Sequence, residues 1–553
     1  MAALFFRNTL GLVALSSAAL ASPESTSAAP PNIILILSDD EDIALGGLNP
    51  LSKTKSWLRD QGTTMTNYFV TTPVCCPSRT SMLSGRYAHN LDDLTQGWCG
   101  NFVSSGEVNT TFAVDLSAKG YRTGLFGKWV NNDCGVAEGG TQGMGPYYVP
   151  AGWDSFFGMC NENIYWGMIW NDQGTRNATG TFDNEKLDGT GGASNYSTSL
   201  IGNRTTAFVS QALDDAVPFF AMVNPHAPHV PATPAPWHLD SLPNVTAVVT
   251  PAYDVAPVGH HWLVSDKVDA LSPELVAFSD TLARMRQLSL LAVDDIVNEL
   301  HKLLMGHPSQ PLDNTFVIYT SDHGYSLGQM RLASGKYHVF ENDVRAPFFI
   351  AGPGVAANAL NPAMSSNIDI SATILDLAGC DPKASGTDGM SLVPALLAAS
   401  GDDVAPTWPR DRILLEYWGC CDASATSFVW RGGCACDDPY PNQCGVGDCG
   451  ADGVHDALLD APSNTWVSLR VVNTSHDLAY VEYRGRNDAP SPAFTNFTAL
   501  YDVAADPDQL TNVLALPPAE AAAYLAKARI DVMDLQEELF ALATCLGDSC
   551  LTA

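Results

Sequence analysis

The most constraining feature of this chain is a continuous apolar run that ends abruptly in acidic residues. Residues 32–37 read Asn-Ile-Ile-Leu-Ile-Leu and residues 39–42 read Asp-Asp-Glu-Asp. Such a run is typical of a central strand of a parallel sheet, buried on both faces. Open α/β sheets place their sites at the carboxyl ends of these strands. Because adjacent carboxylates repel one another, the pattern favours a metal-binding or polar pocket over a solvated turn.

Helical and strand-like segments alternate along the first part of the chain, which predicts a doubly wound α/β arrangement. The stretch 132–203 has no clear period and is rich in Gly, Asn, Tyr and Trp, so we expect long loops that line a substrate cleft. The expected helices cover 51–61, 111–119, 271–304 and 368–377, and the expected strands cover 65–70, 121–126, 218–223, 315–320 and 347–351.

The pattern changes at about Pro406. Short apolar segments separated by turn residues predict an antiparallel sheet, followed by a closing helix over 519–542. The expected architecture is a large doubly wound domain with a mixed or parallel sheet over 32–405, and a smaller C-terminal α+β domain with an antiparallel sheet over 406–553. The expected strands of the smaller domain cover 413–417, 466–472, 478–483 and 499–503.

The amino terminus indicates export. Residues 1–21 contain Arg7, an apolar run and an Ala-Leu-Ala ending, which is typical of a cleaved signal peptide, and residues 22–31 read as a linker. Seven Asn-x-Ser/Thr sequons agree with passage through a secretory pathway. No later stretch reaches membrane-spanning length. We expect a protein secreted to the medium, the cell wall or the periplasmic space, with the lysosome as the alternative.

Charge and cysteine usage narrow the function further. A net charge of −32 argues against nucleic acid as a partner and against docking on anionic lipid. An anionic substrate would then require a locally positive site. Six of the 14 cysteines cluster within 420–449 without paired Cys-x-x-Cys spacing, which favours a disulfide-stapled loop over a zinc site.

A second motif places two cysteines before a predicted helix. Residues 73–86 read Pro-Val-Cys-Cys-Pro-Ser-Arg-Thr-Ser-Met-Leu-Ser-Gly-Arg. Pro77 suits a first helical turn, so a helix over 77–84 would hold both thiols at its amino-terminal end. Backbone N–H groups there, together with Arg79, favour an anion. A buried or disulfide-bonded cysteine pair is the alternative.

Further polar groups follow the other predicted strands. Asp322 and His323 come directly after the strand over 315–320, as Asp39 and Asp40 follow the first strand. Carboxylates at the ends of neighbouring strands suit a hard cation such as calcium or magnesium. Three more candidates lie in nearby motifs: Lys128 in Gly-Lys-Trp, His229 in Ala-Pro-His-Val-Pro, and Lys336 in Ser-Gly-Lys.

Taken together, these motifs resemble those of the type I sulfatases of the alkaline phosphatase superfamily. Residues 75–79 match the signature Cys-x-Pro-Ser-Arg, and the other motifs follow in the family's order, ending with the block at 500–512, across nearly all of the mature chain. Within the family, the chain looks most like the algal arylsulfatases and the N-acetylglucosamine-6-sulfatases, which also carry Cys-Cys-Pro-Ser-Arg.

The resemblance implies hydrolysis of sulfate monoesters, either aryl or carbohydrate sulfates. It implies that a formylglycine-generating enzyme converts Cys75 to formylglycine, whose hydrated aldehyde attacks sulfur with one hydroxyl and releases sulfate through the other. It also implies one Ca²⁺, or another divalent metal, held by Asp39, Asp40, Cys75 as formylglycine, Asp322 and His323.

Roles for the remaining residues follow from the same resemblance. Arg79 would orient the hydrate, Lys128 and Lys336 would bind sulfate oxygens, and His229 would protonate the leaving alcohol or contact sulfate. Many sulfatases have a histidine where this chain has Val130, so the second base is open and Asn131 is a candidate.

Two histidines and one cysteine in or near these motifs have no assigned part in the reaction. We expect His226 to be a loop histidine and Cys76 to pack or form a disulfide. His89 is either a substrate-pocket residue or a helix-end histidine. Substrate selection would lie in the loops over 132–203 and 259–262.

Two alternatives to a sulfatase stay open at this point. A phosphate or phosphonate monoester hydrolase would use the same site, and an Asp-His metal pair also occurs in phosphonate monoester hydrolases. A catalytically silent secreted glycoprotein is the second alternative, and an unmodified Cys75 would indicate it.

Overall fold

The computed structural model describes most of the predicted mature chain. The described residues are 29–91, 99, 102–103, 105–131, 147–160, 164–178, 195–261, 264, 270–332, 334–397, 408–419, 464–484 and 497–551. The expected signal peptide, most of the expected linker and the cysteine-rich segment 420–449 lie outside them. Among the described helices, none has both the length and the apolarity that a membrane crossing requires.

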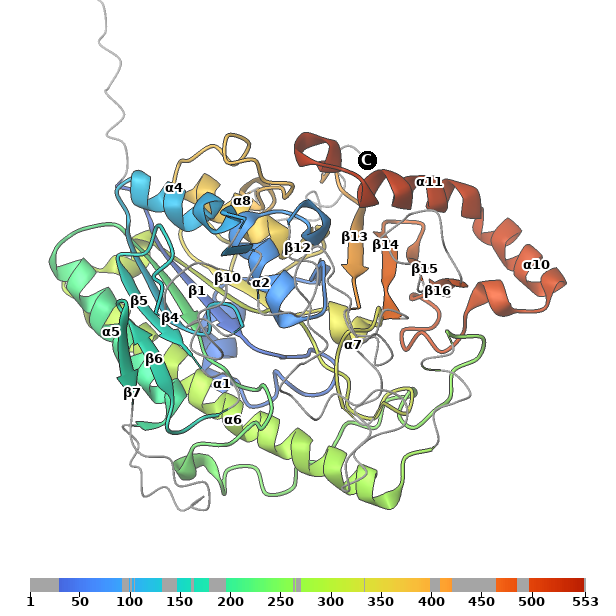
Figure 1. The fold of residues 1–553 in the computed structure, drawn as a ribbon, viewed down its shortest axis with the longest axis horizontal. Helices are drawn as coiled ribbons and strands as arrows, with labels where there is room; N and C mark the ends of the chain where they lie inside the picture. The colour runs from blue at the N-terminus through green and yellow to red at the C-terminus, as the bar shows by residue number, and fades with distance from the viewer. Residues whose placement is uncertain are drawn as a thin grey trace, which may run out of the picture.

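Ten described strands form one mixed sheet in the order β11-β2-β10-β9-β1-β8-β4-β5-β6-β7. Figure 1 labels β1, β4, β5, β6, β7 and β10 of this sheet. β1 lies in the middle, parallel to both β8 and β9, and β8 is parallel to β4. β10 runs antiparallel to its neighbours, as do β6 and β7 at the far edge. The strands are β1 Asn32–Ser38, β2 Thr63–Met65, β4 Arg122–Gly127, β5 Ser155–Met159, β6 Ile169–Asp172, β7 Thr175–Ala178, β8 Phe219–Asn224, β9 Thr315–Ser321, β10 Phe348–Ala351 and β11 Ala359–Asn361.

Helices cover both faces of this sheet, which is why β1 lacks alternation. Ile33, Leu35 and Leu37 pack into one apolar cluster with α2, α4 and α8, whereas Ile34 and Ile36 pack into another with the π-helical turn Lys55–Arg59, α5 and α6. All five side chains are fully buried. The helices are α1 Ser52–Thr54, which continues as a π-helical turn over Lys55–Arg59, α2 Cys75–Ser84, α4 Phe112–Ala118, α5 Ser197–Asp214, α6 Pro273–Gly306, α7 Glu341–Val344, α8 Ile368–Leu377 and α9 Val393–Leu397.

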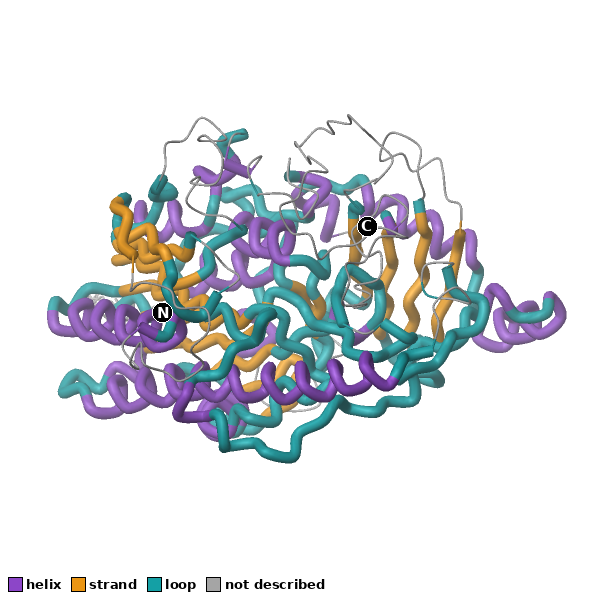
Figure 2. Tube along the Cα trace, turned by 60° about the horizontal axis from the view of Figure 1, so that its bottom comes forward, coloured by secondary structure: helices purple, strands orange, loops and turns teal. Residues whose placement is uncertain are grey.

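A separate antiparallel sheet stands beside the large one (Figure 2). Its order is β13 Arg412–Tyr417, β14 Trp466–Val472, β15 Asp477–Tyr483 and β16 Phe497–Asp502. One face packs on α11 Val532–Ala543 through Leu539 and Leu542. The other face packs on the segments around Val74 and Tyr337. The smaller sheet therefore supports the chain directly before Cys75 and directly after Lys336.

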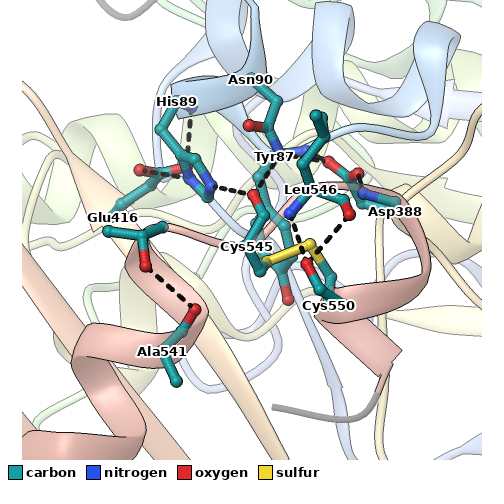
Figure 3. The surroundings of a disulfide bond; sticks show 12 residues. Tyr87, His89, Asn90, Asp388, Glu416, Ala541, Cys545, Leu546 and Cys550 are labelled. Atoms are coloured by element: carbon teal, nitrogen blue, oxygen red, sulfur yellow. Dashed lines mark hydrogen bonds and ion pairs between the residues drawn. A yellow bond between two sulfur atoms is a disulfide. The ribbon is translucent and has the colours of Figure 1, made fainter.

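The carboxyl-terminal end folds back onto the larger sheet's helical layer (Figure 3). A disulfide joins Cys545 to Cys550 after α11. The carbonyl oxygen of Cys545 lies 3.1 Å from His89 Nε2 and accepts a bond from Asn90 Nδ2 at 2.9 Å. His89 Nδ1 lies 3.1 Å from Glu416 of β13. These contacts join the two sheets' layers just beyond α2.

The predicted fold class is confirmed, with four corrections to individual elements. Residues 65–70 do not form one strand, because Thr63–Met65 belongs to the large sheet and β3 Tyr68–Phe69 pairs with β12 Ser365–Ser366 in a two-stranded sheet. The helix predicted over 77–84 begins at Cys75. The closing helix over 519–542 is two helices, α10 Pro518–Ala528 and α11, because the chain turns at Arg529 with a φ of 57°.

The fourth correction concerns the stretch 132–203, which we expected to be loops. Its described part contains β5, β6 and β7 and the start of α5. The strands are short and end in a tight turn at Gln173 and Gly174, both with positive φ. Phe157 of β5 stacks on Trp170 of β6 at 4.1 Å between ring centroids. Aromatic residues favour strands, so the aromatic content of this stretch was the sign of strands that the missing periodicity hid.

Candidate functional site

The first turn of α2 places Cys75 at the centre of the candidate site. The helix begins at Cys75 after Val74 in an extended conformation, and all ten of its residues are buried. Cys75 is fully buried and is not part of a disulfide. The helix ends at Gly85, whose φ of 71° is left-handed and whose N–H donates to Ser81. The start of a buried helix thus presents this side chain to a site rather than to solvent.

Parallel pairing brings the two acidic pairs to one edge of the sheet. Ser38 of β1 lies opposite Ser321 of β9, so Asp39 and Asp40 leave the sheet beside Asp322. Asp40 has a φ of 69°, and its N–H donates to Asp322 Oδ1 at 3.0 Å. The left-handed conformation at Asp40 turns the chain sharply at the end of β1.

Four of the predicted metal-binding residues converge. One ligand atom from each of Asp39, Asp40, Cys75 and His323 lies within 4.8 Å of the others, and all four residues are buried. His323 Nε2 is 3.4 Å from both Cys75 Sγ and Asp40 Oδ1. Since His323 Nδ1 donates to the carbonyl of Gly324 at 2.9 Å, Nε2 is the nitrogen that faces the cluster, and in the neutral ring it carries the lone pair.

Asp322, the fifth predicted metal residue, lies beside this group with its oxygens already engaged. Its Oδ2 accepts from Arg79 Nε at 2.8 Å. Its Oδ1 accepts the backbone N–H groups of Asp40 and His323, each at 3.0 Å. In this geometry Asp322 holds Arg79 and the turn at Asp40 in place.

The predicted lysines also lie in the cluster. Lys128 Nζ is 2.8 Å from Asp39 Oδ2, and Lys336 Nζ is 2.7 Å from Asp40 Oδ1 and 3.1 Å from Cys75 Sγ. Burial alone would raise the pKa of the Cys75 thiol, but Lys128 and Lys336 lower it to about 6. The site therefore stabilises negative charge at position 75 within a strongly acidic protein.

The cationic groups also lower the pKa of the two carboxylates that follow β1. Burial opposes ionisation of Asp39, yet Lys128, His229 and Arg79 hold its pKa well below the ordinary value. Lys336 likewise lowers the pKa of Asp40 against the effect of burial. Both carboxylates are thus ionised at neutral pH and available to a cation.

The donor set fits a divalent metal. Asp40 Oδ2 is buried and has no hydrogen-bond partner among the described residues, as expected of an oxygen that a cation would satisfy. Two carboxylates and one imidazole nitrogen face the same point as the side chain of residue 75. The sulfur of Cys75 stands here for the oxygen that a converted side chain would present. Asp39, Asp40 and His323 would hold the ion together with that oxygen.

Both histidines of the proline-rich loop after β8 reach the site. His229 Nδ1 lies 2.7 Å from the carbonyl of Val230, so its Nε2 faces inward, 3.9 Å from Asp40 Oδ2. The expectation that His226 is only a loop histidine is wrong. His226 is fully buried and its Nδ1 lies 3.2 Å from Asp39 Oδ2, because the loop crosses the end of β1.

Other predicted candidates lie elsewhere or have structural contacts. Cys76 forms a disulfide with Cys99, in agreement with its expected role. His89 contacts Glu416 and Cys545, so it is not placed in the substrate pocket by any described contact. His261 stacks on Tyr483 at 4.1 Å between ring centroids, which places part of the segment 259–262 against the smaller sheet.

Tyr165 is a residue of the site's surroundings that the sequence did not indicate. Its hydroxyl donates to the carbonyl of His229 at 2.8 Å, and its ring lies 5.2 Å from that of His226. Its position within the stretch expected to be loops concealed it. The aromatic content of that stretch was the available signal.

Comparisons with known proteins agree with this geometry. A family model described as Sulfatase matches residues 31–380. The chain is 32% identical to the human N-acetylglucosamine-6-sulfatase over 94% of this chain and 86% of that protein. It is 27% identical to the arylsulfatase of Volvox carteri over 98% of this chain and 78% of that protein.

A further relative and two solved structures extend the comparison. The chain is 36% identical to the extracellular sulfatase SULF-1 homolog of Drosophila melanogaster over 70% of this chain and 33% of that protein. A solved protein in complex with its substrate D-glucosamine-2-N,6-O-disulfate has a TM-score of 0.63 at 19% identity, over 92% of this chain and 97% of that chain. A sulfatase from Pseudoalteromonas has a TM-score of 0.52 at 18% identity, over 94% of this chain and 92% of that chain.

Proposed function

This chain belongs to the sulfatase family of sulfuric ester hydrolases, and we propose that its natural substrate is a 6-O-sulfate ester on an N-acetylglucosamine residue. The 32% identity to N-acetylglucosamine-6-sulfatase extends over nearly the whole chain. Algal arylsulfatases match over a similar length with lower identity. We therefore propose the substrate of the more similar group.

The depth of the site supports this substrate. Cys75 is fully buried, Asp40 is 1% exposed, and the side chain of His229 is 12% exposed. A sulfate on the exocyclic 6-oxygen stands one carbon farther from the sugar ring than a sulfate on a ring hydroxyl. It therefore reaches a recessed nucleophile while the ring stays near His229.

The single observation that carries the reaction is the placement of residue 75 between two lysines and a metal-binding cluster. Sulfatases use a formylglycine made from cysteine, which supplies a hydrated aldehyde as nucleophile and releases sulfate by re-forming the carbonyl. We assign this modification to Cys75, whose maturation would require a formylglycine-generating enzyme. Lys336 contacts this position directly, and Lys128 and Arg79 pair with the neighbouring carboxylates of Asp39 and Asp322.

The chain's own cationic residues would bind the sulfate group. Lys336 Nζ lies against position 75, and Lys128 approaches from the end of β4. As compact charges inside a buried site, they stabilise charge that develops on sulfate oxygens more strongly than they would in water. Arg79, fixed by Asp322, would orient the side chain of residue 75.

His229 would act as the proton donor to the leaving alcohol. Its Nδ1–H is held by the carbonyl of Val230, so Nε2 is the atom that faces the site. Burial would lower the pKa of His229, but Asp40 and Asp39 raise it. A protonated imidazole at the most exposed edge of the site is placed where the sugar oxygen would leave.

The metal would be Ca²⁺, held by Asp39, Asp40, His323 and the converted residue 75. Carboxylate-rich sites prefer hard cations, although the imidazole of His323 also accommodates other divalent metals. When bound, the ion would polarise a sulfate oxygen and favour ionisation of the attacking hydroxyl. Asp322, the fifth predicted ligand, would complete this set, and it would also hold Arg79 and the Asp40 turn in place.

The proposed organisation follows the predicted domains. Residues 32–405 would form the catalytic domain and residues 406–553 the smaller domain, after a signal peptide over 1–21. Two of the relatives are named as extracellular sulfatases. We propose secretion to the cell exterior, with the lysosome as the alternative.

A substrate panel tests the proposal. The values of kcat/KM would be compared for N-acetylglucosamine 6-sulfate, N-acetylgalactosamine 4-sulfate, 4-nitrophenyl sulfate and 4-nitrophenyl phosphate. We expect the 6-sulfated sugar to give the highest value. A higher value for the 4-sulfated sugar would contradict the substrate, and a higher value for the aryl phosphate would contradict the reaction.

A further inference from the structure

His226 is a buried titratable residue that the proposed reaction does not use. It lies in the loop after β8 with no exposed surface. Its Nδ1 is 3.2 Å from Asp39 Oδ2. Because a carboxylate oxygen can only accept a hydrogen bond, Nδ1 is the nitrogen that carries a proton.

Two hydrogen bonds connect Asp39 to the same short segment. The backbone N–H of Asp39 donates to the carbonyl of Ala227 at 3.2 Å, while its side chain accepts from His226. The backbone and the carboxylate of Asp39 are thus held by neighbouring residues. With the backbone of Asp39 held in this way, its carboxylate cannot rotate without breaking the hydrogen bond from His226.

These bonds divide the two oxygens of Asp39 between different tasks. Oδ2 accepts from both His226 and Lys128, the latter at 2.8 Å. Oδ1 lies 3.7 Å from Cys75 Sγ and 3.8 Å from Arg79 Nη2. The oxygen that His226 does not contact is therefore the one that faces residue 75.

The ring of His226 is itself held in position. It lies 4.6 Å from the ring of His229 and 5.2 Å from that of Tyr165, measured between centroids. Tyr165 also anchors the loop through its hydrogen bond to the carbonyl of His229. The imidazole is thus packed on two sides and offers Asp39 a donor at a fixed point.

We infer that His226 is a positioning residue for the metal site, which holds Asp39 Oδ2 so that Oδ1 faces the cation and the converted residue 75. This inference rests on the proposed function. Hydrogen bonds that orient metal ligands typically change metal affinity or activity by about 10–100-fold when they are removed. Loss of the His226 donor is expected to weaken Ca²⁺ binding within that range.

Two substitutions of similar size test this role. His226→Asn keeps an N–H donor near the position of Nδ1, whereas His226→Leu fills the space without a donor. His238→Leu is the matched control, because His238 Nε2 also pairs with a carboxylate, Asp295 at 2.8 Å, outside the site. Mass spectrometry would establish equal conversion of Cys75 in all four proteins.

Ca²⁺ affinity is the primary measurement, by calorimetric titration of the chelator-treated full-length protein. We expect His226→Leu to bind Ca²⁺ about 10–100-fold more weakly than wild type. We expect His226→Asn and His238→Leu to stay within about threefold of wild type. With 4-nitrophenyl sulfate, kcat of the Leu variant should rise toward that of the Asn variant as Ca²⁺ is raised.

Equal Ca²⁺ affinities for the Leu and Asn variants would overturn the role of His226. If the Leu variant does not fold, His226→Gln replaces it, because the longer glutamine side chain donates from a different point. A Ca²⁺ affinity of the Gln variant equal to that of the Asn variant would then overturn the role of His226. A wild-type protein that neither binds Ca²⁺ nor cleaves the aryl sulfate would contradict the proposed function instead.

Discussion

Lys336 Nζ lies 3.1 Å from Cys75 Sγ, although the two residues are 261 positions apart in the chain. Lys336 also lies 2.7 Å from Asp40, which comes from a third segment. This arrangement resolves the difficulty of an acidic protein acting on an anion, because the positive charge is concentrated at the buried nucleophile position. The same contact makes Lys336 the most direct target for a test of sulfate binding.

Lys336→Met should lower kcat/KM for an aryl sulfate by about 10²–10³, the scale of losing one preorganised electrostatic group. Methionine keeps most of the side-chain volume, so the loss would reflect charge. Lys302→Met is the control, since Lys302 is 62% exposed and pairs with Glu299 on α6. A near-normal kcat/KM of the Lys336→Met enzyme would show that Lys336 does not bind the sulfate group.

Arg79→Ala should reduce kcat/KM by roughly two orders of magnitude or more. It should also lower the free energy of unfolding by about 3–5 kcal/mol, because it leaves the buried carboxylate of Asp322 without its partner. Both side chains of this pair are fully buried at 2.8 Å. Chemical denaturation and steady-state kinetics measure the two effects.

Arg122→Ala provides the comparison for Arg79. Arg122 pairs with Asp215 at a similar distance of 2.7 Å, but both side chains are substantially exposed. Its removal should change the free energy of unfolding by less than about 1 kcal/mol and leave kcat/KM unchanged. Equal effects of the two substitutions would show that the buried pair has no special role.

The contact between His89 and Glu416 predicts a pH dependence of stability. Burial would lower the pKa of His89, but Glu416 raises it above the ordinary value of 6.5. The stability that His89 contributes to the fold is therefore complete below pH 6.5 and is lost as pH rises through the folded pKa. Burial would raise the pKa of Glu416, but His89 lowers it, so that contribution is present above 4.5 and is lost at lower pH. The pair should stabilise the fold most between about pH 5 and 6.

Melting temperatures of wild type and His89→Gln across pH 4 to 9 would measure this effect. Asp388, Tyr87 and the carbonyl of Cys545 also face His89 and stay unchanged in the variant. We expect the difference in Tm to be largest in the acidic window and to shrink above the raised pKa. A difference in Tm that does not vary with pH would contradict the assignment.

Removing the disulfide between Cys545 and Cys550 should lower stability without affecting the reaction. A loop of this length is expected to contribute roughly 2 kcal/mol through the unfolded chain. The paired substitution Cys545→Ala with Cys550→Ala should therefore lower Tm and leave kcat unchanged under folding conditions. Loss of kcat at full folding would show that this end of the chain acts on the site.

Much of the site was predictable because its residues follow strands at fixed points. Asp39, Asp40, Asp322 and His323 are adjacent to the ends of β1 and β9, and parallel pairing brings such ends together. The apolar run over 32–37 identified the central strand from composition alone. Local pattern and topology therefore agreed at the part of the fold that positions the chemistry.

The features that the sequence did not predict are set by contacts between distant segments of the chain. His226 and His229 stand three positions apart in one loop, and only the crossing of that loop over β1 shows that His226 contacts Asp39. β5 shows no alternation of apolar and polar residues because Phe156 and Phe157 are both buried, each in a different apolar cluster. Tertiary packing overrides local preference in both places.

Mass spectrometry of the Cys75 peptide from active, natively secreted protein shows directly whether Cys75 becomes the nucleophile. We expect formylglycine at position 75, in a fraction that rises in proportion to the specific sulfatase activity of different preparations. Full sulfatase activity in a preparation whose Cys75 is entirely an unmodified thiol would contradict this expectation.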